Sequence, residues 1–405
     1  MKHTQKLPAA VLALIGLSFV LGSCEYVVVA ILPDIAAGLG ADLGGVGKLV
    51  SVFAAGYAIG TPVLMAAAGR VPKYRLLMDL LTLFLAANAV SMLAPSLTVL
   101  YLSRVAAAVM TGTLTAVLFL FVREVTPPEQ SAKAVSLVYA GMSLATVVGN
   151  PLNKLICRYF GWRAAFGMIL AVGAVLLPIL ARLLPHQITE TTGEGGSFFR
   201  QFTMLRDARY TLCVLIAVCS YGATYVVYTY LPPILTDVLG VGEAAVSPLL
   251  MAVGLCCVGS NLLAGWVGAH GGIRRTPLVL LGQAALFAAM PALLGGQWMG
   301  LAAMLAMCLL MYALSTPVQL HALELSAKEY PYAASLCAST LSVAANIGVA
   351  LGSFASSGLQ SAVGLRALGW PAAVFALAGV AANLALIRAC GWGRPMNRVS
   401  GNQNV

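Results

Sequence analysis

Long apolar stretches separated by short polar segments run through the whole chain. We identify twelve of them, each close to or above the length of about 20 residues that a helix needs to cross a bilayer. They lie at about residues 8–32, 45–68, 76–95, 97–122, 132–157, 162–184, 209–232, 245–268, 276–294, 298–320, 333–359 and 369–391. The pattern predicts an all-α membrane protein with twelve transmembrane helices.

Composition supports a membrane protein and argues against a metal or redox site. Hydrophobic residues make up 60% of the 405 residues and charged residues only 9%, whereas soluble domains carry about 25% charged residues. The nine cysteines contain no CxxC pair and the four histidines are scattered. Neither a zinc site nor a disulfide framework is indicated, so we expect no metal and no other cofactor.

The net charge of +10 would suit a nucleic-acid-binding protein, but its distribution indicates membrane orientation instead. With both termini placed in the cytoplasm, most of the 23 Lys and Arg residues fall in inner segments. The exceptions are Arg104 within a span and five residues in outer loops, namely Lys48, Lys154, Arg158, Arg163 and Arg366. This positive-inside bias predicts a multi-pass protein of the plasma (inner) membrane with both termini cytoplasmic.

A polar stretch in the middle divides the chain into two halves. Residues 1–184 and 209–405 hold six spans each, a cytoplasmic linker occupies 185–208, and the second half ends in a polar tail. The end of span one, Leu32-Pro33-Asp34-Ile35, is echoed at the end of span seven by Leu231-Pro232-Pro233-Ile234. Because matching positions have the same expected sidedness, we predict two pseudo-symmetric six-helix bundles with a site between them near the midplane.

Glu25 is a carboxylate inside the first apolar stretch, which holds no other charge from Leu7 to Leu32. An ionisable group near the bilayer centre costs at least ~2.5 kcal/mol, so it marks a functional site by default. Arg104 in span four is expected at a similar depth. Glu25 could bind a proton from one side and release it on the other under the influence of Arg104. A fixed ion pair that holds the two helices together is the structural alternative.

Other polar side chains are candidates for contact with a solute. Tyr221 and Tyr225 share one helical face of span seven, and rings with hydroxyl tips suit a cavity for an amphipathic solute. Packing or anchoring at the membrane interface would use the same residues. Asn150 in span five and Asn346 in span eleven could contact a solute or form hydrogen bonds between helices.

Three groups of residues carry a resemblance to a known family. They are Gly22-Ser23-Cys24-Glu25-Tyr26 with Leu32-Pro33-Asp34-Ile35 in span one, Gly141-Met142 with Gly149-Asn150-Pro151 in span five, and Thr316-Pro317 with Ala344-Ala345-Asn346-Ile347-Gly348 in spans ten and eleven. In these motifs, and over its whole length, the chain resembles the major facilitator superfamily. Within it, the drug/proton antiporter branch with sugar-efflux and chloramphenicol-efflux proteins is the most similar.

The resemblance implies roles for individual residues. Tyr26 and Met142 would contact the substrate together with Tyr221, Tyr225, Asn150 and Asn346, and Glu25 and Arg104 would couple the protons. Conformational change would depend on Arg70 in the basic loop between spans two and three, on Gly149 and Gly348 as packing and hinge positions, and on Pro151 as a bend in span five. Gly69 stands where many family members have an Asp that latches the inner helix ends, so the loop motif differs here.

These features predict proton-coupled efflux of small amphipathic solutes by alternating access. A passive uniporter or an importer in the same fold stays open as the alternative, since Glu25 alone separates them. An intramembrane enzyme is disfavoured because the sequence has no HExxH motif, Ser-His-Asp set or phosphate-binding loop. We expect a monomer that binds a small molecule, protons and lipid, and no nucleic acid. Sugars, amphenicol-like drugs and nucleosides all remain possible substrates.

Overall fold

The computed structural model describes the chain except residues 1–7, 69–70, 187–203, 205, 331–333 and 391–405. All regular structure in the described residues is helical, and twelve helical segments are long and apolar enough to cross a membrane. The prediction of an all-α protein with twelve transmembrane helices is therefore confirmed. Most of the expected linker at 185–208 lies outside the described residues.

The first six spans are α1 (Ala9–Ala30), α3 (Leu43–Ala67), α4 (Lys73–Leu93), α5 (Leu97–Glu124), α6 (Pro128–Leu144) with α7 (Asn150–Phe160), and α8 (Trp162–Leu183). The last six are α10 (Ala208–Tyr228), α12 (Glu243–Ala269), α13 (Thr276–Leu293), α14 (Gln297–Leu310) with α15 (Ser315–Glu329), α16 (Ala334–Val363), and α17 (Gly369–Ala389). Short helical segments α2 (Leu32–Leu39) and α11 (Leu231–Pro233) follow the first and seventh spans.

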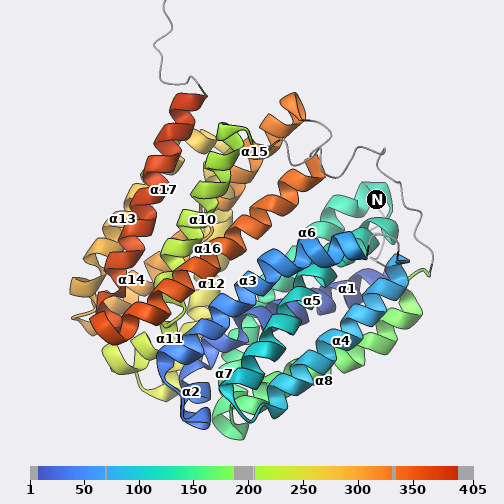
Figure 1. Ribbon diagram of the computed structural model, residues 1–405, viewed down its shortest axis with the longest axis horizontal. Coiled ribbons are helices and arrows are strands. Elements are labelled where there is room, and N and C mark those ends of the chain that lie inside the picture. Colours follow the sequence, from blue (N-terminus) through green and yellow to red (C-terminus); the bar gives the residue numbers. More distant parts are fainter. Residues whose placement is uncertain (1–7, 69–70, 187–203, 205, 331–333, 391–405) are drawn as a thin grey trace, which may run out of the picture.

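The spans form two bundles with matching contacts. In the first bundle α1 packs against α5, α6 and α8, and in the second α10 packs against α15, α16 and α17. Figure 1 shows the two bundles meeting where α2 and α11 lie and spreading apart toward the end where α1 begins and α17 ends. We call these the closed end and the terminus side. The arrangement is the pseudo-symmetric pair of six-helix bundles that the sequence repeat predicts.

Two arginines at equivalent positions reinforce the bundles at their closed ends. Arg163 at the start of α8 donates a hydrogen bond of 2.9 Å to the carbonyl oxygen of Ala94, just after α4. Arg366 ahead of α17 donates one of 2.7 Å to the carbonyl oxygen of Pro291 in the last turn of α13. Carbonyl groups at helix C-termini lack intrahelical partners and attract cations. Each arginine thus joins the third span of its half to the sixth.

The bundles touch each other along two symmetry-related pairs of spans. Span two packs against span eleven through α3 and α16, and span eight packs against span five through α12 and α7. At Gly254 in α12, an added Cβ atom would lie 2.6 Å from the carbonyl oxygen of Thr146 and 2.5 Å from the Cα atom of Val147. Backbones come this close only where a side chain is missing, as in small-residue contacts between membrane helices.

A tyrosine bridges the bundles at the closed end. The Tyr230 hydroxyl lies 3.3 Å from the carbonyl oxygen of Leu43 at the start of α3, and 3.1 Å from Oγ of Ser357 in α16. Burial raises the pKa of Tyr230 to about 12, so the hydroxyl keeps its proton and can donate it. Gly47 leaves room for this hydroxyl, because a Cβ atom there would collide with it.

The structure corrects three details of the expected spans. Lys154 is not in an outer loop: it is buried in α7 and pairs with Asp34 of α2 at 2.7 Å. Span ten extends to Glu329, beyond the expected end at residue 320, and is interrupted between α14 and α15. Span five contains a π-helical turn at Ala145–Gly149, directly before Asn150 and Pro151. The interruption of span ten and the π-helical turn of span five are changes in backbone hydrogen bonding. The spacing of apolar residues does not reveal such changes.

Prediction for the orientation. A cysteine at Ala244, exposed at the start of α12, should react with a membrane-impermeant maleimide added to intact cells, and a cysteine at Ser197 should not. The reason is the positive-inside bias, which places the linker in the cytoplasm. Both variants are made in a background in which the nine native cysteines are replaced by serine. Permeabilised cells supply the control, since both sites should react there. Labelling of Ser197→Cys in intact cells would contradict the orientation.

Prediction for the contact between the bundles. Gly254→Ala should lower the thermal unfolding midpoint in detergent by several degrees and weaken the contact between α12 and span five, because overpacking costs about 1–3 kcal/mol. Gly265→Ala is the matched control in the same helix, since an added Cβ there meets open space. We expect it to change the midpoint little or to raise it. Equal midpoints for the two variants would mean that the close approach at Gly254 has no energetic importance.

Candidate functional site

A cavity of about 290 Å³ lies between the two bundles. It is lined from the first bundle by Glu25, Tyr26, Tyr57, Tyr139 and Met142, and from the second by Ala217, Ser220, Tyr221, Tyr225, Asn261, Met311, Tyr312, Leu314, Ser315, Val318, Gln319, Leu341, Ser342, Ala345, Asn346 and Val349. Cavities of this size are at the lower end for drug-sized ligands. Because both bundles supply its walls, relative movement of the bundles must change its shape.

The cavity lies on the terminus side of the contact made by Tyr230. Its wall in span ten runs from Met311 to Gln319, and its wall in span eleven begins at Leu341 near the terminus side. At the closed end the bundles are held together by Tyr230 and by the packing of α3 on α16. The Gly254 contact joins them deeper, beside Thr146 and Val147 in the middle of span five. A solute could therefore enter this conformation from the terminus side.

Glu25 lies in the second half of α1, five residues before its end at Ala30, and is partly exposed to the cavity. Among the described residues that line the cavity, it is the only Asp, Glu, Lys, Arg or His. It also lines a small adjoining pocket with Phe53 of α3. A carboxylate in this place meets any solute or water that enters the cavity.

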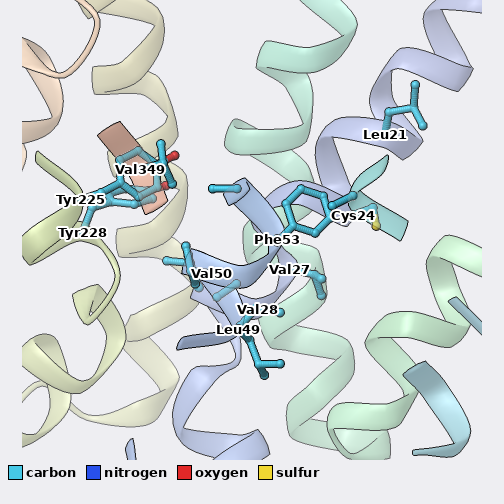
Figure 2. Packing of buried hydrophobic residues seen from close by; sticks show 14 of the residues in the cluster. Leu21, Cys24, Val27, Val28, Leu49, Val50, Phe53, Tyr225, Tyr228 and Val349 are labelled. Atoms are coloured by element: carbon cyan, nitrogen blue, oxygen red, sulfur yellow. The ribbon is translucent and has the colours of Figure 1, made fainter. Parts of the chain in front are cut away.

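Arg104 is completely buried in α5 behind Glu25. Its Nη2 donates a hydrogen bond of 2.6 Å to the carbonyl oxygen of Cys24, and its Nη1 donates one of 3.1 Å to the Cys24 Sγ. The guanidinium carbon lies 4.3 Å from the centroid of the Phe53 ring, and Figure 2 shows this ring beside Cys24. Arg104 therefore interacts electrostatically with Glu25, but its hydrogen bonds go to the residue before it.

This geometry differs from the fixed ion pair considered as an alternative. In the described structure Arg104 forms no ion pair with Glu25, and it does not line the cavity. A carbonyl oxygen, a thiol and aromatic faces surround the guanidinium. The positive charge is held inside the protein, and the negative charge next to it is left facing the cavity.

Aromatic side chains from both bundles meet across the cavity. The hydroxyls of Tyr26 and Tyr312 lie 3.4 Å apart, although 286 residues separate them in sequence. The Tyr221 ring packs edge-on against Tyr312, with 6.0 Å between the ring centroids. Tyr225 packs against Tyr228, which is buried and does not line the cavity. The structure thus brings Tyr26, Tyr221 and Tyr225 together at one site.

Met142 and Asn346 also line the cavity, whereas Asn150 does not. Asn150 is buried at the junction of the π-helical turn and α7, which pack against α1 and α12. Its position between packed helices places it away from a solute in this conformation. Of the two roles considered for Asn150, a contact between helices therefore fits its placement better than contact with a solute.

The expected conformational residues fall in close helix contacts. At Gly149 an added Cβ atom would lie 2.8 Å from Oγ of Ser23, and at Gly348 it would lie 2.5 Å from the carbonyl oxygen of Val218. Gly149 thus packs on α1, and Gly348 packs on α10. Pro151 is the second residue of α7, directly after the π-helical turn. Arg70 lies outside the described residues.

Sequence reasoning missed a break in span ten beside the cavity. Residues 311–314 separate α14 from α15 and are not helical. Ser260 of α12 accepts a hydrogen bond of 2.7 Å from the Tyr312 amide, and Gln283 of α13 donates one of 2.9 Å to the carbonyl oxygen of Leu310. Neighbouring spans satisfy the freed backbone groups, which permits irregular backbone within a membrane. The break aims Tyr312 at Tyr26.

Sequence reasoning also missed Tyr57, Tyr139, Asn261 and Gln319 on the cavity wall. Tyr57 and Asn261 lie within spans two and eight, as Glu25 does within span one. A search for polar and aromatic residues at equivalent depth in the other cavity-facing spans would have found them.

Two six-helix bundles that enclose a central cavity closed at one end define the class of membrane transporters. The family model of the Major Facilitator Superfamily matches residues 14–338. The chain belongs to that superfamily.

Relatives in sequence include an MFS-type transporter, a chloramphenicol resistance protein and a probable sugar efflux transporter. An MFS-type transporter of Bacillus subtilis, YtbD, is 28% identical over 390 residues, which is 96% of each chain. A chloramphenicol resistance protein of Streptomyces lividans is 31% identical over 238 residues, 58% of this chain and 60% of that one. A probable sugar efflux transporter of Pasteurella multocida is 28% identical over 246 residues, 60% of each chain. The last two matches thus span less than two thirds of those relatives.

Solved structures show the same fold. A bacterial homologue of the human lysosomal transporter Spinster, in an inward-facing and unoccupied conformation, aligns with a TM-score of 0.75 at 17% identity and covers 96% of this chain and 98% of its own. The nucleoside transporter NupG aligns with a TM-score of 0.72 at 12% identity and covers 94% and 99%. At these identities the likeness concerns the fold alone.

Prediction for span five. Pro151→Ala should leave the protein inserted but slow its transport several-fold. Proline has no amide proton and cannot continue the helical hydrogen bonds; alanine restores the proton and favours a regular helix in place of the π-helical turn. Resistance to a panel of small amphipathic compounds in a pump-deficient bacterial host measures the effect. Pro178→Ala, also inside a span but in α8 away from the cavity, is the control. Equal resistance for both variants would make Pro151 a packing residue only.

Proposed function

We propose that this protein exports small amphipathic solutes across the inner membrane in exchange for protons, by alternating access of the central cavity. The observation that carries the proposal is the place of Glu25: a lone carboxylate within a membrane span, facing a cavity between two bundles. Its cost in the bilayer argues that it is retained for function. One relative is named a probable sugar efflux transporter and another a chloramphenicol resistance protein, and both names agree with transport out of the cell.

The proposed cycle uses the two ends of the cavity in turn. In the present conformation the closed end is held by the Tyr230 bridge and by the packing of α3 on α16. If the terminus side is cytoplasmic, as the charge bias indicates, Glu25 can release its proton there and the cavity can take up a solute. Rocking of the bundles then breaks the bridge and opens the opposite end, where the solute leaves and Glu25 binds a proton.

Arg104 is assigned a positioning role for Glu25 in this cycle. Its hydrogen bonds to the carbonyl and thiol groups of Cys24 hold α1 next to the carboxylate. The buried positive charge stabilises the ionised form of Glu25 once the proton has left. Arg104 itself need not reach the solute, because it stays enclosed between α1, α3 and α8.

A passive uniporter or an importer is the competing function. Neither needs an intramembrane carboxylate that exchanges its proton in each cycle, so the effect of neutralising Glu25 separates the candidates. The relatives and the family point to a transporter and away from an enzyme.

Prediction for the coupling residue. Glu25→Gln should abolish proton-driven export, because the amide cannot release a proton. The variant should still bind solute and exchange it passively. Glu25→Asp is the matched control: it keeps the charge but shortens the side chain, so partial export is expected. The measurements are transport by reconstituted vesicles with and without a pH gradient, and the thermal midpoint of each variant. A stable Glu25→Gln protein that still moves solute uphill would rule out the coupling role.

A further inference from the structure

The described cavity wall offers a solute one carboxylate and no cationic side chain. The described lining residues include Glu25 but no Lys, Arg or His. The nearest cation, Arg104, is fully buried, and Phe53 covers its guanidinium. Two N–H groups of Arg104 also donate to Cys24. A solute in the cavity would therefore contact the Glu25 carboxylate and not the guanidinium.

Six tyrosines from five elements line the same cavity as this carboxylate. They are Tyr26 in α1, Tyr57 in α3, Tyr139 in α6, Tyr221 and Tyr225 in α10, and Tyr312 in the break of span ten. The face of a tyrosine ring is the negative end of its quadrupole and attracts cations within about 6 Å. Aromatic rings around a carboxylate are the chemistry by which proteins recognise ammonium groups.

The other polar side chains on the cavity wall are neutral, and several of them offer hydrogen-bond acceptors to a ligand. Asn261 donates its Nδ2 to the carbonyl oxygen of Cys257 at 3.1 Å, and Asn346 donates its Nδ2 to that of Ser342 at 3.1 Å. Each amide thus uses a donor within its own helix and keeps Oδ1 as an acceptor. Tyrosine hydroxyl oxygens accept hydrogen bonds as well. These groups are neutral and offer both donors and acceptors, so the lining holds no positive charge that would favour a phosphate or carboxylate over a cation.

We propose that the exported solute is an amphipathic organic monocation, an aromatic amine or quaternary ammonium compound, whose cationic group rests against Glu25 and the surrounding tyrosine rings. The inference rests on the proposed function and adds its substrate class. It also supplies the means of exchange: the cationic solute and the proton occupy the same carboxylate, so that binding of one requires departure of the other.

A pair of isosteric probes tests the charge directly. 3-Hydroxyphenyltrimethylammonium and 3-tert-butylphenol have nearly the same shape and differ by one positive charge. Titration calorimetry on the purified full-length protein at one fixed pH should show the cation binding about ten-fold tighter or better. In Glu25→Gln this preference should fall to within about two-fold.

Ring variants separate the tyrosine cage from the carboxylate. Tyr221→Phe keeps the aromatic face and should keep the preference for the cation, whereas Tyr221→Leu should reduce it about three-fold or more. Tyr159→Leu, on the exposed surface of α7 outside the cavity, should leave both affinities unchanged. If Glu25→Gln fails to fold, the Tyr221 variants still decide the test.

The possible outcomes distinguish this inference from the proposed function. Equal affinity for the two probes, or a preference that survives in both Glu25→Gln and Tyr221→Leu, overturns the cationic substrate class. Proton-driven vesicle transport of a neutral compound such as chloramphenicol, together with equal probe affinities, would leave the proposed function standing. Cation binding that responds to Glu25→Gln, without any effect of a pH gradient on transport, would support the substrate class and overturn proton coupling.

Discussion

A membrane interior offers no water to solvate charge, and the placement of Arg104 and Glu25 follows from this constraint. A buried guanidinium is tolerated only where the protein itself supplies acceptors. Arg104 finds them in the carbonyl and thiol groups of Cys24 and in two aromatic faces. This ties α5 to α1 at the residue before Glu25. The carboxylate is thereby left on the cavity side of α1, where water and solutes reach it.

The same constraint shapes the contacts that must change during transport. Between helices in lipid there is little hydrophobic driving force, so close packing and a few hydrogen bonds hold the bundles together. Gly254 meets backbone directly, and the Tyr230 hydroxyl bridges to Leu43. Separating such contacts uncovers few polar groups. The contact between the bundles can therefore be firm in one conformation and still separate without a large desolvation cost.

Sequence patterns predicted the features that depend on hydropathy and on isolated polar residues. The twelve spans follow from apolar length, and Glu25, Tyr26, Tyr221, Tyr225, Met142 and Asn346 all line the cavity. The break at Met311–Leu314 was not predictable, because its backbone groups are satisfied by Ser260 and Gln283 from other spans. Lys154 was misplaced for a similar reason, since its partner Asp34 is distant in sequence. Asn150 looked like Asn346 in sequence, and only the packing of its helix separates the two.

Arg163 and Arg366 have a mechanical consequence for the molecule. Each fastens an outer pair of spans, α4 with α8 and α13 with α17, at the end farthest from the terminus side. In the described structure none of these four helices lines the cavity, so in an alternating-access cycle we expect each linked pair to support its bundle as it turns about the closed end. A small displacement near Glu25 would then become a larger one at the mouth of the cavity. Loss of either hydrogen bond would let the linked spans move separately, and less of the displacement would reach the mouth of the cavity.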